Sequence, residues 1–495
     1  MNAQTRFEQY IEHLAGGLGH ADRHSGLKAY CTGLMLPLTR KSVEPMAASV
    51  DPLHASARHQ ALHHFVAKAD WSDDELLRRV SQWVVPRMDF SGGGFWIVDD
   101  TGFPKKGRHS VGVARQYCRV LGKQDNCQIA VSVSLACEQA SIPVAWQLYV
   151  PREWAEDNER REKAGIPAQI GFETKVQIAL RQIEALLAAG APRHCVLADA
   201  GYGIDNAFRQ HLDDLGLSYV VGITSALVVW PPGVKPLPPK PYGGMGRPPV
   251  VPRRTRARQP VNVKDLAHSL PATAFTTLSW REGSNETLSG RFAAVRVRHA
   301  GGNTGKARLR PEQWLLIEWP ASDADPLKYY LSNLPADTAL EQLVAHAHMR
   351  WRIERDYQDL KQELGLGHYE GRGWRGFHHH AALAIAAYGF LLSERLATGT
   401  PVSTKKTSQH ARHLQFPTIT LRGEVRRAQR HTADSIATIR YELTVRLVAG
   451  LDVCPCCRNL GRRFDLKRVA PYPPGHRAPE ERSVRLSPHS ARAQH

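Results

Sequence analysis

The sequence TALEQLVAHAHMRWRIERDYQDLKQELGLG, which runs from Thr338 to Gly367, predicts one long helix. Thr338 is followed three residues later by Glu341, the pattern of a capping box at a helix start. Gly365 and Gly367 are residues at which helices commonly stop. We therefore expect the helix to begin at the capping box and to end at these glycines.

One face of this helix carries a charged and polar series. At spacings of four, three and four residues it presents Arg350, Glu354, Tyr357 and Lys361. Residues so spaced lie on the same side of a helix, so an acid stands between two bases with a phenol beside them. A solvated face with ion pairs is the simpler interpretation, and the helix alone does not decide between it and a functional site.

The charge balance predicts a polyanionic partner. The chain has 495 residues, enough for two to four domains, and its apolar share of 42% supports a sizeable core. Its net charge is +18 and its pI is about 9.7. Nucleic acid is the partner that such a balance favours, whereas a membrane surface would call for a strongly amphipathic basic helix, which the sequence lacks.

Targeting and redox signals point to a reduced cytoplasmic protein. The first residues, MNAQTRFEQYIEHLAGGL, are polar, and no run reaches the ~18 apolar residues of a membrane span. The eight cysteines are scattered, except for Cys454, Cys456 and Cys457, and do not resemble a secreted disulfide framework. We expect a cytoplasmic protein associated with the nucleoid through DNA, and no membrane association.

Shifts in pattern along the chain predict five parts. The first is helical and is either a DNA-binding domain or a layer packed on the next domain. The second and fourth form one α/β core, the third is a basic loop with a β-rich insertion, and the fifth is basic with a disordered tail. The expected boundaries are residues 1–90, 91–225, 226–325, 326–400 and 401–495.

The second part predicts an ordered series of strands around one helix. Apolar runs or alternation indicate strands at residues 95–98, 127–136, 142–150, 195–198 and 217–223, and helical spacing indicates a helix at 172–189. Asp99 and Asp100 follow the first strand, and Asp199 follows the fourth. The order matches a ribonuclease H-like core, in which the first and fourth strands are neighbours and their terminal acids meet.

Basic residues gather in a long irregular segment beyond this core. Residues 230–260 are rich in Pro, Gly and Arg and predict a loop. Arg247, Arg253 and Arg254 within it resemble a minor-groove hook, although a solvated linker is the simpler interpretation. Strand-like runs at 275–280, 292–297 and 314–319 predict a small β-rich insertion, and 329–331 a strand that returns to the core.

The acids predict an oxygen-rich metal site. Two aspartates at adjacent strand ends and Glu354 on a facing helix would offer the hard anionic ligands that Mg²⁺ prefers. Two such ions can hold both the attacking and the leaving oxygen of a phosphodiester. Each aspartate alone is more simply explained as a turn former. The combination of the acids, the strand order and the basic charge favours the metal site.

Taken together, these motifs resemble the bacterial insertion-sequence DDE transposases that carry a Tyr-Arg-Glu-Lys signature. Arg350, Glu354 and Lys361 fit the signature spacing, whereas its Tyr position is Ala347. Asp-Asp-Thr-Gly at 99–102 and Leu-Ala-Asp-Ala-Gly-Tyr-Gly at 197–203 resemble the family's first and second acid motifs. The resemblance covers roughly residues 94–396.

The resemblance implies Mg²⁺-dependent DNA strand cleavage followed by strand transfer, with Mn²⁺ as a substitute ion. Asp100, Asp199 and Glu354 would be the catalytic residues and bind two metal ions. Asp100 is preferred over Asp99 because the family's acid directly precedes Thr or Ser. The implied partner is double-stranded DNA, both transposon ends and target, bound by a homodimer.

The same resemblance implies a set of DNA contacts. Lys361 lies roughly 10 Å beyond Glu354 along the helix and would contact phosphate, and Arg350 would do likewise or hold Glu354. The other candidate DNA-binding residues are Lys105, Lys106, Arg247, Arg253 and Arg254. Candidates for stacking on a displaced base are Trp230, Trp280 and Trp314.

Two other functions remain open at this point. A metal-dependent, structure-specific nuclease could use the same core to cut DNA without joining it. A catalytically silent DNA-binding protein derived from a transposase would keep the charge but not the reaction, and the complete set of acids argues against it. The Cys454–Cys457 cluster lacks a partner pair of the usual zinc-site spacing, so structural zinc is the less favoured interpretation there.

Overall fold

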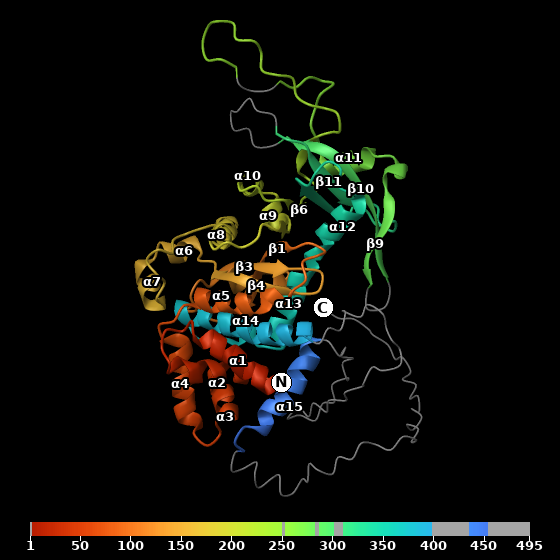
Figure 1. Cartoon of the computed structure of the whole chain (residues 1–495). Coiled ribbons are helices and arrows are strands. Elements are labelled where there is room, and N and C mark those ends of the chain that lie inside the picture. Colours follow the sequence, from red (N-terminus) through yellow and green to blue (C-terminus); the bar gives the residue numbers. More distant parts are fainter. Residues whose placement is uncertain (1, 250–252, 283–286, 301–309, 398–434, 454–495) are drawn as a thin grey trace, which may run out of the picture. The chain divides into compact units, whose positions relative to one another are not determined.

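The computed structural model describes residues 2–249, 253–282, 287–300, 310–397 and 435–453 (Figure 1). Residues Met1–Leu451 form one compact unit, and Asp452–His495 form a second, of which only 452 and 453 are described. The cysteine cluster and the tail of the fifth part lie outside the described residues. The division of the chain into five parts stays a prediction.

A mixed sheet of twelve strands runs through the compact unit. The strand order is β2-β3-β1-β5-β6-β12-β11-β10-β7-β8, with β4 also paired to β3 and β9 to β10. The strands are β1 (Phe95–Pro104), β2 (Ala114–Cys118), β3 (Lys123–Ala136), β4 (Ser141–Leu148), β5 (Cys195–Ala198), β6 (Tyr219–Ile223), β7 (Val228–Trp230), β8 (Val261–Asn262), β9 (Thr276–Glu282), β10 (Thr287–His299), β11 (Gln313–Glu318) and β12 (Lys328–Ser332).

The predicted α/β fold with a ribonuclease H-like strand order is confirmed. Along the sheet the core strands stand in the order β4, β3, β1, β5, β6. β1 pairs antiparallel with β3 and parallel with β5, and β5 pairs parallel with β6. The first and fourth strands of the predicted series are therefore neighbours.

The first strand is longer than the apolar pattern indicates. We expected it to end before Asp99, but β1 continues through both aspartates to Pro104. β3 supplies the reason, because its antiparallel pairing with β1 extends as far as Cys127 opposite Pro104. The parallel pairing with β5 does stop at Val98 opposite Ala198, so the aspartates still lie where the parallel ladder ends.

The β-rich insertion continues the core sheet instead of forming a separate one. β12 pairs antiparallel with β6, and β11, β10 and β9 follow in sequence from that edge. The long loop between β7 and β8 carries the basic segment (Figure 1). A short helix, α11 (Val263–Ser269), follows β8.

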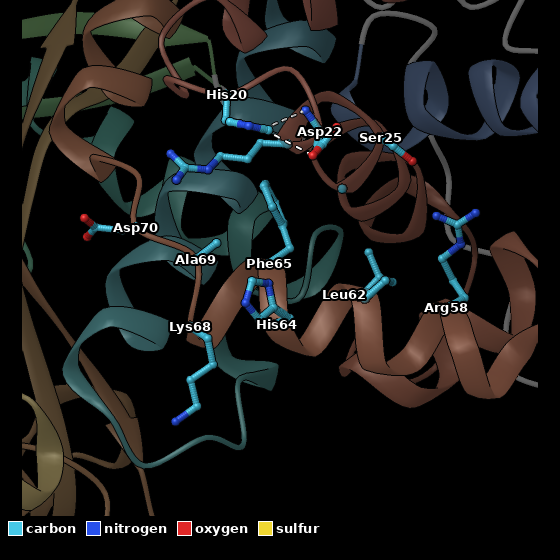
Figure 2. Close-up of a pocket in the computed structure, with 13 residues that line it drawn as sticks. His20, Asp22, Ser25, Arg58, Leu62, His64, Phe65, Lys68, Ala69 and Asp70 are labelled. Carbon is cyan, nitrogen blue, oxygen red and sulfur yellow. Dashed lines mark hydrogen bonds and ion pairs between the residues drawn. The ribbon is translucent and has the colours of Figure 1, made fainter.

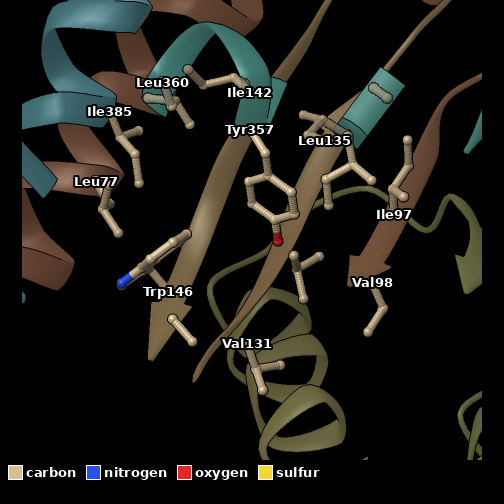
Figure 3. Close-up of a cluster of buried hydrophobic side chains, with 14 of the residues drawn as sticks. Leu77, Ile97, Val98, Val131, Leu135, Ile142, Trp146, Tyr357, Leu360 and Ile385 are labelled. Atoms are coloured by element: carbon tan, nitrogen blue, oxygen red, sulfur yellow. The ribbon is translucent and has the colours of Figure 1, made fainter. Parts of the chain in front are cut away.

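Helices cover both faces of the core strands. α8 (Lys175–Ala188) lies on one side, and α5 (Asp73–Val84), α13 (Trp351–Gln362) and α14 (Trp374–Ala397) lie on the other (Figure 1). Figure 3 shows Tyr357 and Leu360 of α13 meeting apolar side chains of β1, β3 and β4. This packing explains why residues 95–98 are buried along their whole length, since a strand covered on both faces has no solvent side.

The predicted N-terminal helices pack together, and four of them contact α14. They are α1 (Ala3–Ala15), α2 (Arg23–Met35), α3 (Val43–Val50), α4 (Ala55–Ala67) and α5. α14 is buried from Trp374 to Ser393 apart from Arg375, and α1, α2, α4 and α5 all contact it, as does α15 (Ile436–Ala449). The three consecutive histidines of α14 belong to this packing: His379 stacks on Trp71 with ring centroids 3.5 Å apart, and His380 bonds to Tyr30.

The helix expected from Thr338 to Gly367 is divided in two. α12 (Leu340–Met349) and α13 are separated by Arg350. α12 contacts β5 and β6 of the core and β9 and β10 of the insertion, whereas α13 contacts β1 and β4. Because a sheet twists between neighbouring strands, one straight helix does not follow both surfaces. The prediction of a capping box at Thr338 is also wrong, because the hydroxyl of Thr338 donates to the carbonyl of Pro335 and Ala339 is the N-cap.

A buried carboxyl fixes α13 to the sheet and to α14. Asp356 is fully buried and accepts hydrogen bonds from the hydroxyls of Ser141 on β4, at 2.7 and 2.6 Å, and Tyr388 on α14, at 2.8 Å. Burial raises the pKa of Asp356 to about 6, against the lowering effect of these bonds and of nearby arginines.

Gly203→Ala is expected to destabilise the compact unit at the end of the short helix that follows Asp199. A Cβ at this position would lie 2.0 Å from the carbonyl oxygen of Gly222, a backbone atom that cannot move aside alone. We expect a loss of about 1–3 kcal/mol in the free energy of unfolding, measured with urea. Gly171→Ala is the matched control, since nothing lies within 4 Å of its Cβ. Equal stability of the two variants would contradict the packing of α9 (Ala200–Gly203) on β6.

Asp356→Asn tests the buried carboxyl through pH. The folded-state pKa of about 6 lies above the ordinary value of 3.8, so the folded protein binds the proton more tightly. The stabilisation is complete below pH 3.8 and is lost as the pH rises through 6. The stability of the unmodified protein relative to Asp356→Asn should therefore fall between pH 4.5 and 7.5, by on the order of 2–3 kcal/mol. Parallel urea-unfolding stabilities across this range would contradict the raised pKa.

Candidate functional site

The two aspartates of β1 occupy opposite faces of the strand, as neighbouring residues in a strand do. Asp99 is only 2% exposed and faces α13, where Arg350 contacts it. Asp100 is partly exposed and faces α8, where Lys175 Nζ lies 3.0 Å from its Oδ2. The phenol of Tyr202 lies 3.5 Å from the same oxygen. The two rival first acids therefore have different partners.

The second predicted acid begins the short helix α9 directly after β5. Asp199 is its N-cap, and its Oδ1 accepts a hydrogen bond of 2.8 Å from the backbone of Gly201. Since Val98 pairs with Ala198 in parallel, residues 99 and 199 follow at the same level of two adjacent strands. The turn-former interpretation of Asp199 is thus correct for its Oδ1, while its Oδ2 is engaged elsewhere.

Two arginines join three carboxylates from three distant segments. Arg119 lies 3.1 Å from Asp99 through Nη1 and donates through Nη2 to Asp199. Arg350 lies 3.0 Å from Asp99 through Nη1 and donates through Nη2 to Glu354. Asp99, Asp199 and Glu354, together with these two arginines, are called the carboxylate cluster below. Asp100 has no contact with either arginine in the described part of the chain.

The face of α13 that the spacing singled out lies on the sheet instead of facing solvent. Lys361 Nζ donates to the hydroxyl of Thr101 at 2.6 Å and to the carbonyl of Gly102 at 3.0 Å. The phenol of Tyr357 bonds to Ser132 of β3 at 2.8 Å. The solvated-face interpretation is therefore wrong for these two residues, although the side chain of Glu354 remains 60% exposed.

Burial shapes the titration of the groups around the cluster. It raises the pKa of the Asp99 carboxyl, and Arg350 and Arg119 act against that rise. Burial also lowers the pKa of Lys361 to about 8, which Cys118 and Asp99 partly offset. The pKa of the Tyr202 phenol is raised well above its ordinary value by burial and then by Asp100 and Asp99, so the phenol stays neutral.

The donor chemistry of the cluster fits a divalent metal. Its three acids are hard oxygen donors of the kind that Mg²⁺ takes. Within the described residues no three His, Cys, Asp or Glu side chains are grouped closely enough to hold an ion as they stand. The guanidinium of Arg119 lies between Asp99 and Asp199. This positively charged side chain therefore occupies the place at which a metal ion would be expected.

The remaining predicted DNA-binding residues are separate from the cluster. Lys105 follows β1, and its Nζ donates to the carbonyl of Tyr369 at 2.9 Å, while the neighbouring Lys106 is exposed. Arg247, Arg253 and Arg254 are exposed on the loop between β7 and β8. Among the tryptophans, Trp230 is buried, with the Arg254 guanidinium 5.9 Å from its ring, and Trp314 donates to the carbonyl of Pro335.

Three residues of the site escaped the sequence interpretation. Arg119 stands in a hairpin 20 residues after Asp99, and no local motif marks it. Lys175 follows Thr174, whose capping box with Gln177 begins α8 and thereby directs the lysine to Asp100. Tyr202 does belong to the Ala-Gly-Tyr-Gly motif after Asp199, so its position next to the second acid was the available signal.

A hollow of about 510 Å³ lies among the N-terminal helices (Figure 2), and none of the residues that line it belongs to β1, α9 or α13. It is lined from α2 and α4 and from the turns beside them. Two of its charged groups already have partners: Arg58 pairs with Asp51 at 3.1 Å, and Asp70 pairs with Arg375 at 2.8 Å. We assign the site to the carboxylate cluster and not to this hollow.

Comparison with known proteins gives the chain's relationships. The family model of the DDE superfamily endonucleases matches residues 13–287. A relative described as "Probable transposase for insertion sequence element IS701", from Microchaete diplosiphon, is 32% identical over 194 residues. These residues are 39% of this chain and 47% of the relative, so the chain matches about half the length of that relative.

A solved structure, the cryo-EM piggyBac transposase synaptic complex with hairpin DNA, is also similar. It aligns with a TM-score of 0.40 and 10% identity over 95% of this chain and 77% of that chain. None of the helices in the described part of the chain combines the length and apolar character needed to span a bilayer.

The family match includes both strand-end aspartate motifs and covers more than half of the chain. It stops before α13, the helix that carries Glu354. The parallel register of β1 and β5 and the acids at its end agree with a family named for its acidic residues. The chain belongs to the family of DDE superfamily endonucleases.

Proposed function

We propose that this protein is a DNA transposase, which cleaves DNA at the ends of an insertion sequence and transfers the freed strands into target DNA. One observation carries the proposal. Three carboxylates from β1, the start of α9 and α13 converge through two shared arginines, although they are up to 255 positions apart in the sequence. The similarity to an IS701 transposase supports the substrate class.

Asp99, Asp199 and Glu354 are the acids that we assign to metal binding. When bound, two Mg²⁺ ions, or Mn²⁺ in their place, would supply Lewis-acid activation of the attacking oxygen and offset the charge of the phosphodiester. Asp99 shares its arginine partners with both other acids, whereas Asp100 pairs with Lys175. The geometry therefore favours Asp99, and the family's Asp-Thr pattern favours Asp100.

The basic residues around the cluster would position DNA. Arg350 holds Glu354 against Asp99, so we assign it to orienting the third acid. Lys361 donates a hydrogen bond to the Thr101 hydroxyl. It would contact a phosphate near the scissile bond only if this hydrogen bond to Thr101 were broken. Lys105 and Lys106 flank β1 and would contact the DNA backbone nearby. Arg247, Arg253 and Arg254 would contact DNA at a distance from the cut.

The partner assignments follow from the reaction. The substrate would be double-stranded DNA, both the transposon ends and the target. We propose a homodimer that pairs two ends, acting in the cytoplasm on nucleoid DNA. The chain's net charge of +18 favours such a polyanion.

A nuclease that cuts but does not join is the second candidate. The family description, an endonuclease superfamily, favours it as far as the first step is concerned. Hydrolysis and strand transfer use the same acids and differ in the second nucleophile, which is water or a freed 3′-hydroxyl. A joining assay with a labelled end and supercoiled target DNA separates the two functions.

Single substitutions of the four candidate acids test the site. We expect Asp99→Asn, Asp199→Asn and Glu354→Gln to reduce Mg²⁺-dependent cleavage of the flanking end DNA by more than about 100-fold. Losing a metal ligand should exceed the roughly 10–100-fold effect of losing an outer-shell partner. Asp100→Asn should reduce cleavage by less. Glu341→Gln, on the exposed first turn of α12, is the control and should leave cleavage unchanged.

DNA binding, measured on the same variants by gel shift, separates chemistry from folding. Loss of cleavage with binding retained supports the assignment. If Asp100→Asn abolishes cleavage while Asp99→Asn still cuts, the first acid is Asp100 and Asp99 only holds the arginines. If the unmodified protein binds the ends but cleaves none of them, the catalytically silent alternative replaces the transposase.

A further inference from the structure

Arg119 stands at the tip of the hairpin formed by β2 and β3. It begins the 3-10 turn Arg119–Leu121, and Gly122 closes the turn in the left-handed region at φ +64°. From this tip its guanidinium reaches across to the first and second acids, with one nitrogen on each. One cation is thereby shared by two of the acids that the proposed function assigns to metal binding, and Arg350 supplies a second cation to Asp99.

The positions of Arg119 and of a metal between these acids exclude one another. A divalent ion held by Asp99 and Asp199 would need the carboxylate oxygens that now bind Arg119. Two positive charges at that place would also repel each other strongly, because one of the acids is buried. Asp99 keeps Arg350 when Arg119 withdraws, so a metal ion would replace Arg119 only as the cation shared by Asp99 and Asp199.

The two arginines of the cluster are held differently. The side chain of Arg350 is 21% exposed and is fixed at the start of α13, where it also binds Glu354. The side chain of Arg119 is 46% exposed, and its neighbours Val120 and Leu121 are exposed too. Arg119 can therefore withdraw from the acids without opening the packed core, whereas Arg350 cannot leave without releasing Glu354.

We propose that Arg119 is a built-in counter-ion that competes with the catalytic metal. In the metal-free protein its single positive charge is shared by Asp99 and Asp199, and its guanidinium keeps other cations from the place between them. Loading of the site requires the guanidinium to withdraw, so the hairpin tip sets the metal affinity of the site. This inference rests on the proposed function, because it concerns the same acids.

Metal binding without DNA tests this role directly. Mn²⁺ is titrated into the full-length protein, and free Mn²⁺ is followed by electron paramagnetic resonance. We expect Arg119→Gln to bind Mn²⁺ about 3- to 10-fold more tightly than the unmodified protein, since the partly exposed ion pairs it loses are modest. Arg115→Gln is the matched control: it removes the same charge from the same hairpin, at an exposed residue of β2.

Thermal unfolding gives a second readout. In EDTA, Arg119→Gln should melt below the unmodified protein, because the two acids have lost a counter-ion. With saturating Mn²⁺ the difference should shrink or reverse, so the metal-induced rise in Tm is larger in the variant. Arg119→Lys keeps one charge but cannot span both acids, and it should bind Mn²⁺ with intermediate affinity. It serves in place of Arg119→Gln if that variant does not fold.

Three outcomes would overturn the inference. If Arg119→Gln binds Mn²⁺ equally or more weakly, Arg119 does not compete with the metal. If Arg115→Gln tightens binding as much, the effect is one of net charge and not of position. Asp199→Asn locates the measured site: if Mn²⁺ binding survives in that variant, or is absent from every variant, the metal site of the proposed function falls as well. If Mn²⁺ binding is lost only in Asp199→Asn and is unchanged in Arg119→Gln, the metal site stands and only the inference about Arg119 is overturned.

Discussion

The parallel register between β1 and β5 is the constraint on which the site depends. Because Val98 is paired with Ala198, the next residues of both strands leave the ladder at the same level. Each of these residues is an aspartate, and two carboxylates that close together cannot both remain charged without cations between them. Arg119 and Arg350 supply these positive charges. Their contacts bring the β2–β3 hairpin and α13 to the same end of the sheet.

The arrangement of α13 follows from the same requirement. Arg350 reaches Asp99 while Asp356, six residues on, is buried against β4 and α14. Between these two fixed points Glu354 projects toward solvent, with its side chain 60% exposed. The helix is thus anchored by buried polar contacts on one side, whereas on the other side Glu354 is paired with Arg350 and remains open to solvent. The interruption at Arg350 lets α12 follow the inserted strands without moving α13.

The two acids of β1 illustrate how one residue step changes the chemistry. Asp99 faces the helix that carries Glu354 and is almost completely buried, whereas Asp100 faces α8 and the lysine at its start. Asp100 directly precedes Thr101 in the sequence, and Asp99 stands one residue earlier. The faces of a strand alternate, so only the direction of each side chain distinguishes a shared site from a separate ion pair.

The amino-acid pattern alone was enough to predict the strand order, the two strand-end acid motifs and the spacing of Arg350, Glu354 and Lys361. Local patterns carry such information because apolar periodicity and acid placement are set within a few residues. The length of β1, the division of the helix at Arg350 and the entry of Arg119 into the cluster became visible only in the folded chain. Each of these depends on a partner far along the chain, such as β3 for β1 and Asp199 for Arg119. A contact between distant segments leaves no local pattern, and that is why these features could not be predicted.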